Sequence, residues 1–289
     1  MCRARKFWSV TFGCLVTVVC LWPFAAGAAS CVWKVSGPKG GILYLGGSMH
    51  ALRSTDYPLP SAYNRAFDAS SRLVFEDDPK EAKKETSQLM KAGQYPKGDT
   101  LKNHVDPRTY AYLRRFFALG KVPEDKFKNY RPWFIDMILE SPPPQYYDLG
   151  VENFLAQRAL RNSKPISGLE SPSEHNAVFT ALDDRQSETL LLLLFVRAGQ
   201  ETGGGDSMMN AWRHGDAETL QRQLSETYRE FPSFGYRLLG ARNHNWIPKI
   251  ESFLRSSQTH FVVVGAGHFG GPDGLLALLK SRGWQIQQL

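Results

Sequence analysis

Cysteine is scarce in this 289-residue sequence, which contains four. Cys2, Cys14 and Cys20 all lie near the N-terminus, so a chain that loses this segment keeps only Cys31. A single cysteine excludes an internal disulfide, and the hydrophobic core must then stabilise the fold without one. A chain of roughly 260 residues is long enough to bury such a core as one domain.

Two common hydrolase motifs are also missing. The sequence contains no His-Glu-x-x-His, which excludes the usual zincin architecture. It contains no Gly-x-Ser-x-Gly, so Ser48 is not expected to act as the nucleophile of an α/β-hydrolase. Any hydrolytic chemistry must therefore come from another arrangement of side chains.

Long hydrophobic runs are absent except at the N-terminus. Basic residues at positions 3–6 precede an apolar segment, Val10–Trp22, and the small residues Ala25–Ala29 follow it. This order is typical of a secretory signal peptide, and the apolar run is short for a membrane span. We expect residues 1–29 to be a signal peptide and residues 30–289 to be an exported domain, periplasmic or secreted. A retained anchor is the alternative, and the uncleaved signal would then be the only membrane attachment.

The charge is unevenly distributed. The formal net charge is +7, and the segment Pro79–Pro132 holds 13 Lys and Arg against 6 Asp and Glu. The segment could be a solvated helical face, or it could bind an acidic polymer or an anionic membrane surface. We expect no nucleic-acid partner, because the sequence shows no basic stripe with interleaved aromatic residues and an exported protein would not meet one.

Glycine and proline divide the chain into short strands and helices. Apolar or alternating runs predict strands at residues 32–35, 42–45, 73–75, 165–169, 261–264 and 285–289. Helices are expected between most of them, including residues 61–69, 107–120, 133–139, 151–160, 185–198, 216–230, 245–254 and 272–281. The order predicts an α/β fold, a central mixed sheet with flanking helices, in which residues 79–162 form a mostly helical insertion.

Two of the predicted strands run into the same short motif. Ile42–Leu45 is followed by Gly-x-x-His ending at His50, and Phe261–Val264 by Gly-x-x-His ending at His268. Two other strands end in carboxylates, Glu76 and Glu170. The order suggests a degenerate internal duplication with two strand–GxxH units. Because ligands gather at strand ends in α/β folds, these four side chains are candidate site residues. The alternative is that both histidines are ordinary loop residues.

Several segments together resemble the TraB/GumN family, which is related to the Tiki metalloproteases. They are LYLGGSMHALRSTDYPLP, RLVFEDD, KPISGLES, ARNHNWIPKIESFL and VVVGAGHFGGPDGLLALLKSRG. The resemblance implies a metal site with His50, Glu76 and His268 as ligands. It implies Mn or Co more than Zn, although imidazole and carboxylate ligands suit Zn as well.

Three further residues are candidates for catalysis. Glu170 could be a general base or a further ligand, or it could cap the next helix. Arg242 and Asn243 could bind a substrate carbonyl or a developing oxyanion, or Asn243 could cap a helix. The remaining histidines of helical or loop stretches are expected at the surface: His104, His175, His214 and His244.

The expected function is that of an exported, metal-dependent hydrolase with a peptide or protein substrate. The alternative is a non-catalytic secreted protein that binds a pheromone-like peptide or a polysaccharide. The sequence leaves the substrate, the metal and the oligomeric state open.

Overall fold

The computed structural model describes residues 29–37, 41–198 and 204–289 of the protein. The expected signal peptide, apart from Ala29, lies outside the described residues. Among the described residues, no helix combines the length and the apolar character that crossing a membrane requires.

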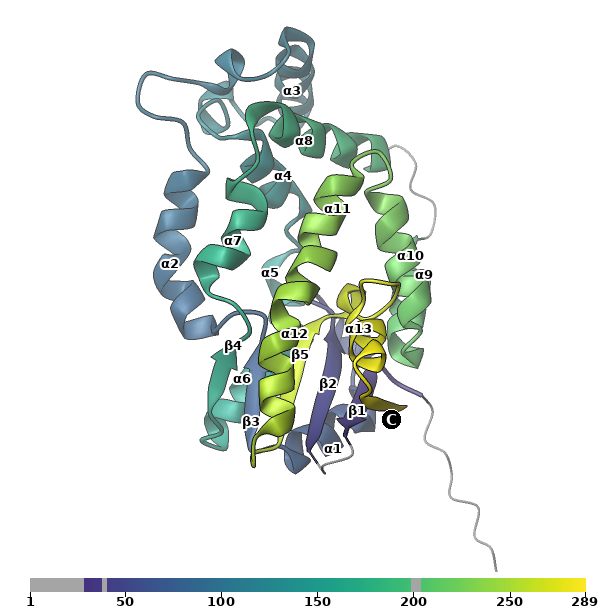
Figure 1. The fold of residues 1–289 in the computed structure, drawn as a ribbon. Helices are drawn as coiled ribbons and strands as arrows, with labels where there is room; N and C mark the ends of the chain where they lie inside the picture. Colours follow the sequence, from purple (N-terminus) through teal and green to yellow (C-terminus); the bar gives the residue numbers. More distant parts are fainter. Residues whose placement is uncertain (1–28, 38–40, 199–203) are drawn as a thin grey trace, which may run out of the picture.

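A mixed sheet forms the centre of the molecule, with strand order β4-β3-β5-β2-β1-β6 (Figure 1). β2 is parallel to β5, β5 to β3 and β3 to β4, whereas β1 is antiparallel to both β2 and β6. This arrangement confirms the predicted α/β fold with a central mixed sheet. The strands are β1 (Val32–Ser36), β2 (Ile42–Ser48), β3 (Arg72–Phe75), β4 (Ile166–Gly168), β5 (His260–Gly265) and β6 (Gln285–Gln288).

The strands of the two strand–GxxH units lie side by side in this sheet. β2 and β5 are paired from Leu43 with His260 to Ser48 with Gly265. The apolar residues of β5 are buried on both faces, as expected for a parallel strand covered by helices. Gly46 permits this close packing, because a Cβ there would lie 2.7 Å from the ring of Phe261.

Helices cover both faces of the sheet (Figure 1). α12 and α13 lie on one face and α1 and α6 on the other, and their buried side chains join those of the strands in the main hydrophobic core. The helices around the sheet are α1 (Ser61–Ala69), α6 (Val151–Arg161), α9 (Gly204–His214), α10 (Ala217–Thr227), α12 (Gly240–Arg255) and α13 (Leu275–Ser281).

A second group of helices extends beyond the carboxyl ends of the parallel strands (Figure 1). They pack around two smaller apolar clusters, one centred on Leu113 and Leu191 and the other on Trp133 and Phe234. This group contains α2 (Pro79–Ala92), α3 (Pro107–Leu119), α4 (Pro132–Glu140), α7 (Pro172–Thr180), α8 (Asp184–Ala198) and α11 (Pro232–Leu238). The short helix α5 (Pro144–Tyr147) contributes to neither cluster, and its Tyr146 carbonyl accepts a hydrogen bond from the Leu52 N–H.

The predicted start of α12 is wrong. We expected a helix from about Asn245 to Leu254. The helix instead begins at Gly240 and continues through Pro248. Arg242 and Asn243 are therefore helical residues, and the capping alternative for Asn243 is wrong. The extra turn is held by tertiary contacts of these two side chains, described below.

Candidate functional site

The four candidate residues at strand ends all lie at one edge of the sheet. β2, β3, β4 and β5 are parallel, so their carboxyl ends meet at this edge. Glu76 follows β3, and Glu170 lies two residues beyond β4. His50 lies two residues beyond β2, and His268 ends the short 3-10 helix Ala266–His268 that follows β5.

Glu76 is buried between the two central strands and α12. Its Oε1 accepts a hydrogen bond from the Gly265 N–H at 2.7 Å and lies 3.7 Å from Nε2 of His268. Its Oε2 accepts a 2.5 Å hydrogen bond from Nη2 of Arg242. Burial by itself raises the pKa of Glu76, but the positive charge of Arg242 holds that pKa well below its usual range. Glu76 is therefore a carboxylate at neutral pH.

Asn243 holds both the ring and the backbone of His268 in place. Its Nδ1 lies 2.7 Å from Oδ1 of Asn243, and Nδ2 of Asn243 donates to the backbone oxygens of His268 and Asp273. The Asn243 carbonyl is an acceptor, so Nδ1 of His268 carries the proton and Nε2 keeps its lone pair. Burial lowers the pKa of His268 to about 3, which keeps the ring neutral. Nε2 faces Nη1 of Arg242 at 3.3 Å and the carboxylate of Glu76.

His50 is held in a similar way by Glu152, a residue that the sequence did not single out. Oε1 of Glu152 lies 2.9 Å from Nδ1 of His50 and also accepts a hydrogen bond from the Ser48 hydroxyl. Glu152 is in the first turn of α6, where the Val151 N–H donates to the Met49 carbonyl. The negative charge of Glu152 raises the pKa of His50 to about 9. The imidazole is exposed, with 64% of its side chain accessible, so solvent weakens this interaction.

Glycine is required where α6 meets the end of β2. A Cβ at Gly150 would lie 2.3 Å from the carbonyl oxygen of His50, so any other residue would push the helix away. The close approach brings the helix N-terminus to the first GxxH box. It is this approach that places Glu152 beside Ser48 and His50.

Arg242 connects the two carboxylates. Its Nη2 donates to Glu76 and, at 2.5 Å, to Oε1 of Glu170, and its Nε donates to Glu170 at 3.1 Å. Glu170 also accepts from the indole N–H of Trp246 at 3.0 Å. Both oxygens of Glu170 are thus engaged, and only 7% of the side chain is exposed. In this arrangement Glu170 fixes Arg242, and a metal or a substrate would bind Glu170 only in exchange for one of these hydrogen bonds.

His175 also belongs to this network, so its expected place at the surface is wrong. Its Nδ1 lies 2.9 Å from Glu170 and 3.7 Å from Glu76. It comes from the first half of α7, whose N-terminus is fixed by a capping box between Ser171 and Glu174. His214 and His244 are exposed, and His104 bridges Asp99 and Asp184 outside the site.

A cleft of about 510 Å³ opens over this edge of the sheet. His50, Glu76 and His175 line its floor, and α2 and α6 contribute its walls. Its further lining residues include Asp77, Lys83, Leu89, Tyr147, Asp148 and Ala156. The cleft has the size and the mixed lining of a small-ligand or peptide-side-chain site.

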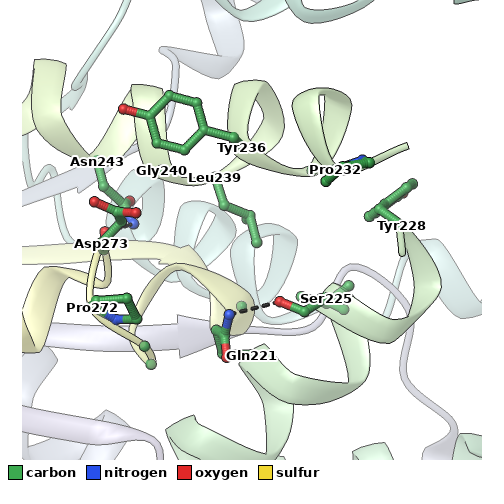
Figure 2. A pocket seen from close by; sticks show the side chains of 15 residues that line it. Gln221, Ser225, Tyr228, Pro232, Tyr236, Leu239, Gly240, Asn243, Pro272 and Asp273 are labelled. Atoms are coloured by element: carbon green, nitrogen blue, oxygen red, sulfur yellow. Dashed lines mark hydrogen bonds between the residues drawn. The ribbon is translucent and has the colours of Figure 1, made fainter. Parts of the chain in front are cut away.

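A smaller cavity of about 230 Å³ lies on the other side of Asn243 (Figure 2). Tyr228, Tyr236 and Leu239 line it together with the glycines of the second GxxH segment. Figure 2 shows Asn243 and Asp273 at one end of this cavity and Tyr228 and Pro232 at the other, with the hydrogen-bonded pair Gln221 and Ser225 between them. None of the strand-end carboxylates lines this cavity, so we place the chemistry in the larger cleft.

The side chains at the sheet edge fit a divalent metal by their chemistry. Glu76, Glu170 and His175 offer donor atoms within 4.8 Å of one another, and His268 adds Nε2 beside Glu76. Mixed carboxylate and imidazole donors suit divalent transition metals. Both GxxH histidines are also held through Nδ1 by an acceptor, as metal-bound histidines usually are. A metal at Glu76 would share that carboxylate with Arg242.

Comparison with known proteins points to one family. The sequence model of the TraB/PrgY/gumN family matches residues 31–288. An uncharacterized protein of Treponema pallidum (strain Nichols) is 23% identical over 281 residues, covering 86% of this chain and 80% of the relative. The metalloprotease TIKI1 of Danio rerio is 23% identical over 305 residues, covering 84% of this chain and 60% of the relative. No solved structure gives a significant match.

Proposed function

The chain belongs to the TraB/PrgY/gumN family, and from this premise we propose that it is an exported, metal-dependent hydrolase of peptide bonds. The resemblance to this family that the sequence indicated is thereby confirmed. His50, Glu76 and His268 would hold the metal, with Mn or Co favoured over Zn. The likeness to a protein named as a metalloprotease supports the proposal, although the chain spans only 60% of that relative.

One observation carries the proposal. Each GxxH histidine is held at Nδ1, by Glu152 or by Asn243, so Nε2 is the nitrogen that would bind a metal. Nε2 of His268 lies 3.3 Å from Nη1 of Arg242, and a metal would replace this contact. The ionised carboxylate of Glu76 stands beside one of these nitrogens and lines the same cleft as the other histidine. Side chains that bind a metal are usually held in position by hydrogen bonds of this kind, as these two imidazoles and this carboxylate are. That the two imidazoles share one ion stays a prediction.

A bound divalent metal lowers the pKa of a water ligand and polarises a carbonyl. The protein's own residues have separate tasks. Arg242, fixed by Glu76 and Glu170, would supply a stationary positive charge to a developing oxyanion. His175 is partly exposed in the cleft and would move a proton there, a task we expected of Glu170. Asn243 would act only by positioning His268, since its amide is used within the protein.

One observation favours the alternative of a non-catalytic binding protein. Arg242 pairs with both Glu76 and Glu170, so each of these carboxylates already has a cationic partner within the protein. In that case the cleft would hold a secreted peptide or polysaccharide intact. The two functions differ in metal content, which is the quantity to measure first.

The test combines metal analysis with peptide hydrolysis. The purified protein is expected to carry about one divalent metal per chain and to cleave peptides, and the His268→Gln variant is expected to lose both properties. His214→Gln on α9 is the matched control, because this histidine is exposed and bonds only the Asn210 carbonyl. A metal-free wild-type protein that binds peptides without cutting them would support the alternative.

Export is tested separately. The proposal is that cleavage near Ala28 or Ala29 produces the mature N-terminus, as the charged and small-residue flanks of the apolar segment indicate. Mass spectrometry of the protein isolated from its host is expected to find this N-terminus. A protein that begins at Met1 would contradict the proposal.

A further inference from the structure

The basic segment Pro79–Pro132, for which the sequence allowed a solvated helical face or an anionic partner, contains an exposed helix with an unusual surface. α3 buries one side, formed by Thr109, Tyr110 and Leu113, against the neighbouring helices. Its opposite side carries five residues at spacings of one and two helical turns, which we name the α3 stripe. The α3 stripe consists of Arg108, Tyr112, Arg115, Phe116 and Leu119.

The α3 stripe exposes apolar groups to a degree that folding alone does not explain. Leu119 is 87% exposed and Tyr112 is 47% exposed, and Val122 follows just beyond the end of the helix. Phe195 of α8 lies 4.8 Å from the ring of Phe116 and 5.0 Å from that of Tyr112. Leu192 and Val196 of the same helix, both exposed, continue this apolar surface.

Positive charges lie within this apolar surface. Arg115 stands between Tyr112 and Phe116 on the helix, and Lys121 follows Leu119 after one turn residue. Neither of these two cations is ion-paired with another described residue, whereas Arg108 and Arg114 pair with Asp106 and Glu124. Figure 1 shows α3 at the end of the molecule farthest from the sheet, and α8 packs beside it through Phe195.

We propose that the α3 stripe docks the protein on an anionic lipid surface. Aromatic and aliphatic side chains with interspersed Lys and Arg are typical of helices that lie in the membrane interface. The unpaired cations match anionic headgroups, and the aromatic rings match the boundary between headgroups and acyl chains. The aliphatic side chains of Leu119, Leu192 and Val196 favour lipid over nucleic acid, because bases stack on aromatic rings and gain little from aliphatic groups.

The sequence analysis missed this pattern. The aromatic and basic residues of α3 are adjacent in the sequence, Arg114-Arg115-Phe116-Phe117, and read as a mixed cluster without a stripe. Only the helical geometry separates Phe117, which packs inward, from Arg115 and Phe116, which face solvent.

The test is binding to lipid vesicles. The wild type and every variant have the same N-terminus, so any vesicle binding by the apolar segment near Met1 is the same in all of them. The wild-type protein is expected to sediment with vesicles of phosphatidylcholine and phosphatidylglycerol, less so as salt increases, and not with phosphatidylcholine alone. Arg115→Gln and Lys121→Gln should each weaken the binding about fivefold, and Leu119→Glu by about tenfold or more.

Matched controls come from α6, which also exposes an apolar and a basic residue. Leu160 is 59% exposed and Arg161 follows it. Leu160→Glu and Arg161→Gln should bind vesicles as the wild type does, and circular dichroism should show that every variant is folded. The proposal is overturned if Leu119→Glu binds like Leu160→Glu, or if the wild type binds neutral and anionic vesicles equally. It is also overturned if the α3 stripe instead binds an oligonucleotide or a second copy of the chain.

Discussion

Replacing Glu76 by glutamine separates the two roles that this carboxylate can have. The substitution keeps the shape and a carbonyl that can accept the hydrogen bond of the Gly265 N–H, but it removes the negative charge beside Arg242 and His268. If Glu76 is a metal ligand, the variant loses the metal and any hydrolytic activity. If Glu76 serves only to pair Arg242, metal content does not change.

The structure sets the magnitude of the effect on stability. Leaving a buried cation without any partner costs about 3 to 5 kcal/mol. Arg242 would keep two hydrogen bonds to Glu170, at 2.5 and 3.1 Å, so the loss is partial. We expect Glu76→Gln to lower the free energy of unfolding of the metal-free protein by about 1 to 3 kcal/mol.

The measurement is urea denaturation with and without saturating metal, alongside metal analysis of the purified variants. Glu226→Gln is the control, because Glu226 pairs with Arg229 at the surface and its loss should cost less than about 0.5 kcal/mol. Full metal occupancy and full activity in Glu76→Gln would refute Glu76 as a ligand. A metal-free variant with wild-type stability would refute the reasoning about Arg242.

Three further predictions concern other buried groups. Glu152→Gln should keep the fold but lower the metal affinity about 10- to 100-fold, because it weakens the hydrogen bond that holds Nδ1 of His50. Metal-buffered titrations measure this affinity, and Glu81→Gln on α2 is the control. Asn243→Ala removes the support of His268 and two hydrogen bonds to backbone oxygens, and should lower the free energy of unfolding by about 2 to 4 kcal/mol in urea. Asp136 of α4 is buried and its Oδ1 has no hydrogen-bond partner, and burial followed by the charge of Glu140 raises its pKa to about 8. The folded protein therefore binds a proton that the unfolded chain has released, so wild-type stability should fall as the pH rises from about 4 to 8. Asp136→Asn should remove this slope and be more stable at pH 8 by about 5 kcal/mol, which corresponds to the difference between a pKa of about 8 and the ordinary value of 3.8. Equal slopes in both proteins would contradict this.

The sequence predicted the edge of the sheet where the site lies because parallel strands obey a simple geometric rule. His50, Glu76, Glu170 and His268 each follow an apolar run, and such runs become neighbouring parallel strands in an α/β fold. The antiparallel strand β6 at the edge was also predicted, from residues 285–289. Local composition was sufficient for these features, since each depends on a few consecutive residues.

The helical contributions to the site could not be predicted in the same way. Glu152 stands in the first turn of a helix, where an acidic residue is ordinary because it interacts with the helix dipole. His175 lies within α7 in a segment with no apolar periodicity. Both reach the site only through the packing of their helices against the sheet edge. The same holds for the first turn of α12, which exists because Arg242 and Asn243 have partners at the carboxyl ends of β3 and β5.

The pairing of β2 with β5 makes the site depend on both ends of the chain. His50 comes from the second strand and His268 from a segment about twenty residues before the C-terminus, and β5 must insert between β2 and β3 before Glu76 meets His268. The site therefore forms only after segments that are 189 residues apart in the sequence have come together, and a local opening of β5 would separate His268 from Glu76.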